Sequence, residues 1–425
     1  MKYFGYLFSE KDNRKKMLYL LLFLGIYQVL TFVPVPGVNR DVLSIMFDQN
    51  KAFDIANVFT GGALKNFSIL AIGIMPYITA SIVIQLLSMD VIPHLSELRQ
   101  QGAMGQKSLK KITYYVAFVV SFIQSFGMAW GFNRLYPGVV TNTSWYNYLL
   151  IAGCLTLGTG ILLVLSWLID KKGIGKGISM IIAAGILMSS PRLFYQIAET
   201  IKLADNLFVT SIEQILYLVA FFVMMWMTVQ VQRAERRLPI QYANHGQKQA
   251  MAKNSNYLPI KLNMAGVIPV IFASSIVMTP ITIAQMYKGN EIADWIVQHL
   301  TYTEPLGMVL FVALIMFFTY FYAFVQTNPE KLALDIQRSG GFLPGVRPGT
   351  ATSEKIAFTM KHLSFAGALF LALLAVAPIV TQQFVTVSFL AIMGGTSLII
   401  MVSVFVDMKS QITVTQLKNN YKSFF

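Results

Sequence analysis

The sequence is poor in cysteine and in charge. Of 425 residues, Cys154 is the single cysteine, and Asp, Glu, Lys and Arg together make up 12%. One cysteine excludes an internal disulfide and a cysteine-based metal cluster, and its place in an apolar run predicts a packed, unreactive thiol. So little charge beside 55% hydrophobic residues excludes a soluble globule of this length. The chain is predicted to be an all-α polytopic membrane protein.

The predicted spans also lack ionisable and catalytic side chains at membrane depth. No ionisable side chain lies near the middle of any predicted span, whereas ion-coupled transporters and proton pumps keep such groups there. The glycine-rich stretch GIGKG at 173–177 lacks Walker spacing and precedes a span, so it predicts a tight turn into the fifth helix. Four scattered histidines and no paired carboxylates give no catalytic or metal-binding constellation. A membrane-embedded enzyme is disfavoured, while a small-solute secondary transporter remains open because backbone carbonyls can bind ions.

Long uncharged runs predict ten membrane-spanning helices. About 17–25 apolar residues cross a hydrocarbon core of about 30 Å. The N-terminus lacks a small-residue cleavage site, so the first run is expected to be a retained span. The last two spans come from one uncharged run, 362–406, which Pro378 and the polar 381–383 are expected to divide. The predicted spans are 17–34, 66–89, 112–133, 147–169, 177–199, 212–231, 262–284, 305–325, 362–378 and 386–406.

The basic residues predict the orientation. With the termini and alternate loops on one side of the membrane, that side carries 26 of the 33 Lys and Arg residues. Because cytoplasmic loops are enriched in these residues, both termini are predicted to be cytoplasmic. The net charge of +14 then belongs mostly to one face, where topology and anionic lipid explain it first. The opposite side keeps Arg40, Lys51, Lys65, Arg134, Arg192, Lys202 and Lys288.

Residues 55–64 are too few and too weakly apolar to span a bilayer. The segment is interrupted by Gly61 and Gly62 and leads directly into the second predicted span. Irregular backbone at membrane depth is tolerated only where protein or water satisfies its polar groups, so a half-length segment here favours a cavity or pore beside it. An interfacial helix on the membrane surface fits the composition as well.

Two predicted cytoplasmic loops, 232–263 and 326–355, are longer than connectors need to be. Both are basic, and the second contains the turn signals GG at 340–341 and PG at 344–345. Loops of about 30 residues are usually functional or disordered. Protruding basic loops can dock an acidic protein surface or the phosphates of RNA, and a purely topological role is the simpler alternative.

Short motifs in a fixed order resemble the bacterial SecY family, whose members form the central subunit of a protein-conducting channel. Each motif is weak alone, but their order and spacing from the first span to the tail are specific. The motifs are PVPG at 34–37, GGAL at 61–64, GIMPYITAS at 73–81, GIGKGIS at 173–179, AERR at 234–237, PIQY at 239–242, NMAGVIPVIFASS at 263–275, QTNPEK at 326–331, PGVRPG at 344–349 and GGTSL at 394–398.

The resemblance implies a clamshell of two five-helix halves, residues 1–204 and 205–425, related by a pseudo-two-fold axis in the membrane plane. It also implies an hourglass pore closed by a short re-entrant plug helix, on Ile55, Val58, Phe59, Gly61, Gly62 and Leu64. The narrowest point of the pore would be a ring of Ile74, Ile78, Ile182, Ile186, Ile271 and Ile400. Aliphatic side chains do not hydrate ions, so such a ring would gate by dewetting.

The resemblance further implies a lateral gate into lipid, between spans two and three and spans seven and eight, with Thr79, Ser275 and Thr279 at the seam. The two basic loops would dock the SecA ATPase and the ribosome through Arg236, Arg237 and Arg347. Implied partners are the small subunits SecE and SecG, signal sequences and unfolded precursors at a bacterial plasma membrane. An accessory paralogue for dedicated substrates is the narrower alternative. Thr279, where many relatives carry an aromatic residue, departs from the family pattern.

Overall fold

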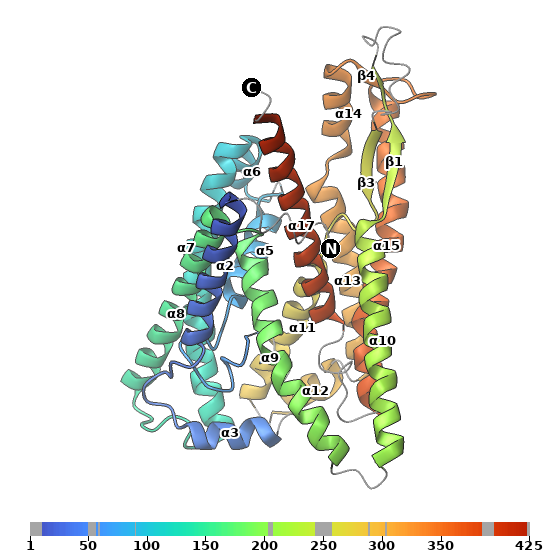
Figure 1. Cartoon of the computed structure of the whole chain (residues 1–425). Coiled ribbons are helices and arrows are strands. Elements are labelled where there is room, and N and C mark those ends of the chain that lie inside the picture. The colour runs from blue at the N-terminus through green and yellow to red at the C-terminus, as the bar shows by residue number, and fades with distance from the viewer. Residues whose placement is uncertain are drawn as a thin grey trace.

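The helices of the chain run mostly along one axis, and its strands protrude at one end (Figure 1). The computed structural model describes residues 11–49, 57, 60–89, 91–202, 207–242, 257–287, 290–301, 304–384 and 395–422. The end with the strands is called the ribbon end here. Two short helices, α3 (Arg40–Gln49) and α12 (Glu291–Leu300), lie toward the opposite end (Figure 1).

Residues up to 202 form a set of helices without strands in the part described. Their order is α2 (Lys11–Leu30), α3, α5 (Met75–Leu87), α6 (Pro93–Gln100), α7 (Ala103–Leu135), α8 (Trp145–Lys172) and α9 (Gly177–Lys202). The helix pairs α5 and α7, α7 and α8, and α2 and α8 pack against each other. The expected tight turn before the fifth span is present, because Gly175 between α8 and α9 has a φ of +94°.

Residues from 207 onward form a second set of helices with four short strands. Their order is α10 (Leu207–Arg233), β1 (Glu235–Pro239), β2 (Gln241–Tyr242), β3 (Tyr257–Lys261), α11 (Ile268–Met286), α12, α13 (Pro305–Gln326), α14 (Pro329–Arg338), β4 (Gly341–Phe342), α15 (Thr350–Phe384) and α17 (Thr396–Lys422). The largest buried apolar cluster draws on both sets, from α2, α5 and α9 on one side and α11, α13, α15 and α17 on the other.

Six helices in the described residues are long and apolar enough to cross a membrane, namely α7, α8, α10, α13, α15 and α17. Shorter apolar helices fall at three more of the predicted spans, over Met75–Leu87, Gly177–Pro191 and Ile268–Ile281. The remaining span, predicted at 17–34, corresponds to α2. The chain is therefore a helical membrane protein, and the count of ten spans stays a prediction.

The second span is not the continuous helix over 66–89 that the uncharged run predicts. Residues 60–74 form successive turns, and the helix begins only at Met75. Gly73 adopts a φ of +65°, which favours glycine and ends the series of turns. Pro76 lies in the first turn of α5, where proline favours the start of a helix. The irregular backbone is tolerated because residues such as Leu70 and Ala71 are buried in the protein.

The last two spans are also displaced from their predicted positions. Helix α15 continues through Pro378 to Phe384, so the chain does not divide at that proline. Residues 385–394, where the tenth span was predicted to begin, lie outside the described residues. Helix α17 starts at Thr396 and runs to Lys422, well past the predicted end at 406. Composition located the apolar run, but it did not show where the helix inside that run begins.

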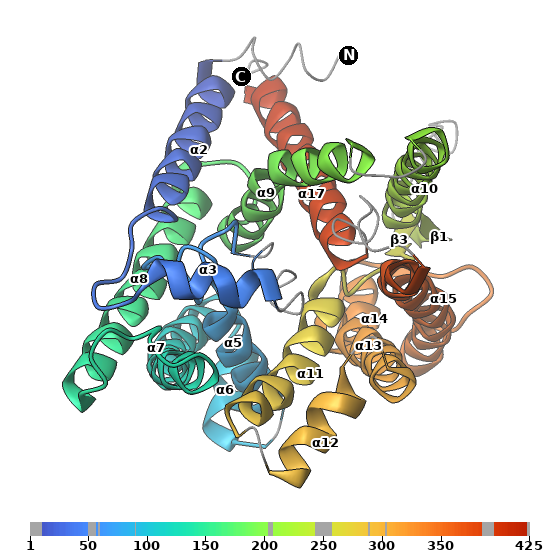
Figure 2. The same cartoon turned by 90° about the horizontal axis from the view of Figure 1, so that it is seen from below.

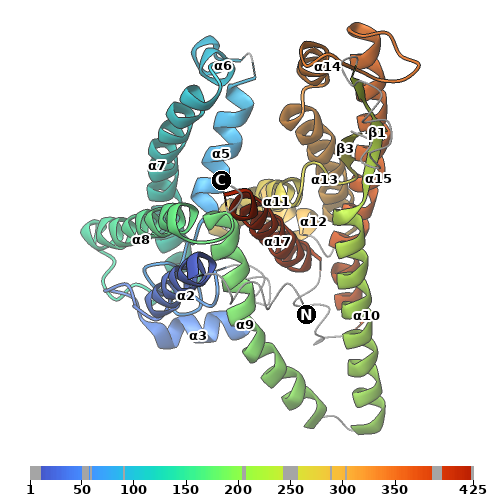
Figure 3. The same ribbon diagram turned by 45° about the horizontal axis from the view of Figure 1, so that its top comes forward.

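The two long basic loops fold together into one structure at the ribbon end. Strands β1 and β3 pair antiparallel within the first loop, and β2 of the first loop pairs with β4 of the second. A separate apolar cluster around Ile260, Ile336 and Met360 lies beneath the strands. Figure 3 shows β1 and β3 continuing from the end of α10 alongside α15, and α14 above the end of α13. We call this unit, residues 235–242, 257–261 and 329–349, the docking head, after the docking role predicted for its arginines.

Candidate functional site

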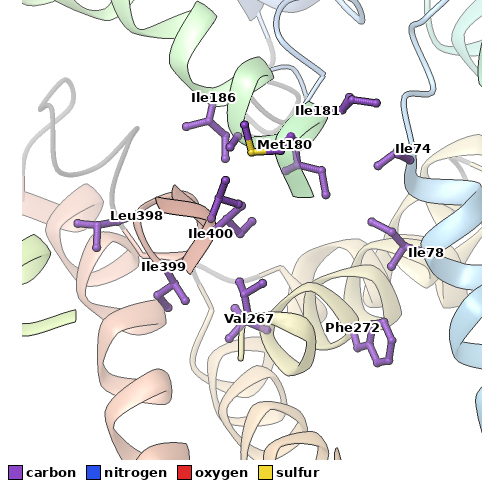
Figure 4. Close-up of a cluster of buried hydrophobic side chains, with 14 of the residues drawn as sticks. Ile74, Ile78, Met180, Ile181, Ile186, Val267, Phe272, Leu398, Ile399 and Ile400 are labelled. Carbon is purple, nitrogen blue, oxygen red and sulfur yellow. The ribbon is translucent and has the colours of Figure 1, made fainter. Parts of the chain in front are cut away.

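Five of the six predicted ring isoleucines line one small pocket between the two sets of helices. The pocket is lined by Ile74, Ile78, Ile182, Ile271 and Ile400, with Thr60, Met75 and Ser274. These side chains come from α5 and the turn before it, from α9, from α11 and from α17. Figure 4 shows Ile74, Ile78 and Ile400 around a common space. The lining is thus mainly aliphatic and comes from both halves of the chain, and aliphatic side chains do not hydrate ions.

Ile186 is brought to the same cluster but does not line the pocket. It is fully buried, one helical turn from Ile182 on α9, and lies near Ile400 (Figure 4). Ile186 therefore packs in the same buried cluster as the pocket isoleucines, outside the pocket lining. The pocket residues that sequence reasoning missed are Thr60, Met75 and Ser274, each of them within three residues of a motif glycine or a ring isoleucine.

An internal sequence repeat places Ile78 and Ile271 at equivalent positions in the two halves of the chain. The stretch GIMPYITAS at 73–81 and the stretch GVIPVIFAS at 266–274 share Gly, Pro, Ile, Ala and Ser at the same spacing. Both glycines have positive φ, +65° and +67°, and both helices begin two residues later with proline in the first turn. Each ring isoleucine is thus the fourth residue of its helix. The repeat could have been found in the sequence alone.

The repeated helices run in opposite directions. Figure 1 shows α6, which follows α5, toward the ribbon end, whereas α12, which follows α11, lies toward the other end. Two helices that start with the same turn and run antiparallel bring equivalent residues to one depth, here Ile78 and Ile271. This arrangement matches the inverted repeats of membrane transport proteins, in which sites lie at the repeat interface.

The predicted plug segment, 55–64, reaches this pocket through Thr60. Ile55, Val58 and Phe59 fall outside the described residues, whereas Gly61, Gly62 and Leu64 belong to a series of turns. Gly61 and Gly62 have φ values of +64° and +88°, and Leu64 is buried. A plug helix over 55–64 stays a prediction.

The predicted lateral gate corresponds to a seam where α5, α6 and α7 meet α11 and α13. Viewed from the end opposite the ribbon, α11 lies between α5 and α13 (Figure 2). The hydroxyls of Thr79, Ser275 and Thr279 each donate to a carbonyl four residues earlier in their own helix, at 2.7–3.2 Å. Ser275 also touches Met75 Sδ across the seam at 4.0 Å. Ser275 therefore contacts the facing helix, and among the described residues none of the three hydroxyls hydrogen-bonds to oxygen or nitrogen across the seam.

Other side chains bridge the seam, and sequence reasoning missed them. Tyr322 on α13 donates a hydrogen bond to Gln85 Oε1 on α5, and Arg99 on α6 donates to the carbonyl of Val325 at 3.0 Å. Ring contacts add to the bridges, because Trp130 of α7 and Tyr287 after α11 have centroids 6.0 Å apart. A glutamine or tyrosine in an apolar run was the available signal, because buried polar groups need partners.

Arg134 strengthens the aromatic bridge. Its guanidinium lies 5.3 Å from the Trp130 ring and 5.8 Å from the Tyr287 ring. A guanidinium at this distance from an aromatic face is attracted to it. The seam is thus held by hydrogen bonds nearer the ribbon end and by a cation–π cluster where α7 and α11 end.

Replacing Tyr322 with Phe tests the hydrogen bond across the seam. The variant keeps the ring, which packs against Phe272, and leaves Gln85 Oε1 without its donor. Because a net hydrogen bond is worth about 0.5–1.5 kcal/mol, separation of α5 from α13 should become about two- to tenfold easier. Export of a precursor with a weakened signal sequence is expected to rise by that factor relative to an intact precursor. Tyr320→Phe, on the same helix, is the matched control, and an equal rise in both variants would contradict the assignment.

The predicted docking arginines of the first loop point to opposite faces of the ribbon. Arg236 is paired in register with the buried Ile260, so its side chain lies on the face toward the protein, although the residue is exposed. Arg237 lies on the other face, bonded to Glu235 at 2.8 Å and 4.7 Å from the Tyr257 ring. The hydrogen bond to Glu235 raises the pKa of the Arg237 guanidinium above its ordinary value.

Arg347 in the second loop is exposed and has no ion pair among the described residues. Its carbonyl accepts a hydrogen bond from the hydroxyl of Thr352 at 2.8 Å, which fixes the turn before α15. The backbone pairing of Gln241 with Phe342 and of Tyr242 with Gly341 links this loop to the ribbon. All three arginines therefore belong to one docking head, and Arg347 is the least engaged.

Comparison with known proteins agrees with this architecture. The family model described as SecY matches residues 68–409. "Protein translocase subunit SecY" of Bacillus licheniformis is 43% identical over 418 residues, covering 97% of each chain, and that of Bacillus subtilis is 43% identical over 417 residues, covering 97% of this chain and 96% of the relative.

Solved structures share the fold at low sequence identity. "The structure of a protein conducting channel" superposes with a TM-score of 0.67 at 17% identity, covering 96% of this chain and 94% of the other. "Sec61 in the Canine ribosome-channel complex from the endoplasmic reticulum" superposes with a TM-score of 0.64 at 17% identity, with the same coverage. With a family match over most of its length and relatives above 40% identity, the chain belongs to the SecY family.

Proposed function

We propose that this chain forms the pore of a protein-conducting channel that moves unfolded polypeptides across a membrane and releases apolar segments into it. The observation that carries the proposal is the convergence of isoleucines from α5, α9, α11 and α17 on one pocket between the halves. Aliphatic side chains bind no peptide side chain strongly, so a ring of them seals at rest and yields around a passing chain. The chain is a channel subunit and not an enzyme.

A small-solute transporter is not favoured by the same pocket. Six of its eight lining residues are Ile or Met, and Thr60 and Ser274 supply its polar side chains. Binding sites for small solutes combine apolar walls with several placed polar or charged groups. An accessory paralogue restricted to a few substrates would share the pocket, and only the range of exported precursors separates it from a general channel.

The finer assignments follow from the family and from the docking head. SecE and SecG are proposed as the small membrane subunits, and the SecA ATPase or a ribosome as the partner that binds the docking head and supplies the work. The membrane would be a bacterial plasma membrane with both chain termini cytoplasmic, because the docking head lies at the end where most loop arginines and lysines gather. Residues 55–64 are proposed as the plug that closes the pore on the other side.

Reconstitution tests the proposed function. Vesicles holding this chain, the small subunits and SecA should protect an unfolded precursor from added protease when ATP is present, and should not do so without ATP. A precursor that lacks its signal sequence is the matched control. Uptake of a small solute by the chain alone, without precursor transport, would overturn the proposal.

A further inference from the structure

A hydrogen bond from α2 anchors the chain directly above the ring. The hydroxyl of Tyr27 donates to the carbonyl oxygen of Thr60 at 3.0 Å. Both residues are buried, Tyr27 to 3% and Thr60 to 7% exposure. The same carbonyl also accepts from the Ala63 amide at 3.3 Å, so the Tyr27 hydroxyl is its donor from another helix and favours one position of the backbone at Thr60.

Close backbone packing fixes the next residue. A Cβ added to Gly61 would lie 2.9 Å from Tyr27 Oη and 3.0 Å from the Cα of Gly185 in α9. Gly61 also has a φ of +64°, which side chains disfavour. The chain therefore touches both α2 and α9 here, and only glycine fits the gap.

The residues around Thr60 hold their own shape. The carbonyl of Asn57 accepts hydrogen bonds from the Thr60 hydroxyl at 3.1 Å and from the Gly62 amide at 3.0 Å. The Asn57 side chain accepts from the Lys65 amide at 2.9 Å. Asn57 with residues 60–65 is called the Thr60 turn here. Because it is internally bonded, the turn moves as a unit when its outer contacts break.

The Thr60 turn is coupled to the ring as well. Thr60 lines the ring pocket beside Ile74 and Ile400, and its methyl group lies 3.2 Å from where a Cβ on Gly73 would be. Any movement of the turn thus changes the wall of the pocket. Its anchors, Tyr27 and Gly185, both belong to the first half of the chain.

We infer that Tyr27 is a positioning residue that keeps the Thr60 turn over the isoleucine ring, and that this turn is attached to the first half. Separating the two halves leaves the Tyr27–Thr60 bond intact, so displacing the turn requires a second, distinct event. The inference rests on the proposed channel function, because it concerns how the resting pore is sealed.

Replacing Tyr27 with Phe removes the hydroxyl and keeps the ring in place. In vesicles holding the full chain with its small subunits, potassium efflux at rest should rise about two- to tenfold, the range of one net hydrogen bond. The ratio of exported weakened-signal precursor to exported intact precursor should rise with it. Tyr19→Phe is the matched control, because Tyr19 lies two turns earlier on α2 and is 40% exposed.

Gly61→Ala is the second variant, and it pushes the turn away from Tyr27 and Gly185 instead of removing a donor. It should raise efflux and the precursor ratio in the same direction as Tyr27→Phe. Efflux that matches the parent in both variants overturns the inference, and so does a parallel loss of abundance and of all export. If the parent transports precursor and Tyr27→Phe behaves like it, only this inference fails; if the parent transports none, the proposed function fails.

Discussion

Replacing Ile400 with Asn is expected to raise the resting ion conductance of the channel by about tenfold or more. Ile400 is 1% exposed and lines the pocket opposite Ile74 and Ile78. An amide there can hydrogen-bond water but has no partner in an apolar ring, so the substitution penalises the dry, closed pore and favours the wet one. Planar-bilayer recording of the unoccupied channel measures the effect, and export of precursors with weakened signal sequences should increase in parallel.

An exposed isoleucine on α7 provides the control for Ile400. Ile123→Asn on α7, where the residue is 64% exposed, introduces the same amide outside the pocket. This variant should lower stability without raising conductance. Cysteines at the six ring positions should also crosslink to a precursor arrested midway. Crosslinks that reach only lipid or neighbouring helices, or equal conductance in the two Asn variants, would disprove the ring.

Replacing Arg347 with Glu is expected to reduce motor-driven precursor transport by about ten- to a hundredfold. The guanidinium is exposed and, within the described residues, has no ion pair, so it is available for charge-assisted contacts with an acidic partner. Reversing its charge turns that attraction into repulsion. The initial rate of ATP-dependent precursor protection in vesicles measures the loss, and rising salt should reduce the difference.

Arg338→Glu is the matched control for Arg347. Arg338 is exposed in the last turn of α14, within the same loop, and the substitution makes the same change of charge. Abundance and ion conductance should stay near normal in both variants. If transport falls equally in both, general loop charge explains docking; if abundance falls with transport in Arg347→Glu, the arginine serves folding.

The sequence predicted the long spans closely and the broken ones poorly. The eighth span was predicted at 305–325, and α13 covers Pro305–Gln326. The agreement is close because a long uncharged run flanked by polar loops is enough to predict where a membrane helix begins and ends. The prediction of the second span was wrong because hydropathy does not reveal the local turns that Gly73 and Pro76 impose. The predicted start of the tenth span lies outside the described residues, and its predicted end was wrong because α17 continues to Lys422 through polar residues.

The pore ring stays a prediction, but the meeting of its isoleucines at one pocket could be expected for a different reason. Five of its six isoleucines meet at one pocket, and they were assigned through motif resemblance, not through any property of isoleucine, which usually faces lipid or packing. Contacts between segments far apart in the sequence were not predictable from one sequence. Examples are the Tyr322–Gln85 bridge, which joins the two halves, and the pairing of Gln241 with Phe342, which joins two loops of the second half.

The strand pairing in the docking head has a mechanical consequence. Strand β3 ends at Lys261, the Leu262 amide bonds to the Ala234 carbonyl at 2.9 Å, and α11 begins only six residues later. Helix α11 is also the seam helix that touches α5 and carries Ile271. Under the proposed function, a force that a bound motor applies to β3 would reach α11 through the six residues 262–267. Binding of the motor and movement of the seam would then be coupled through this short segment.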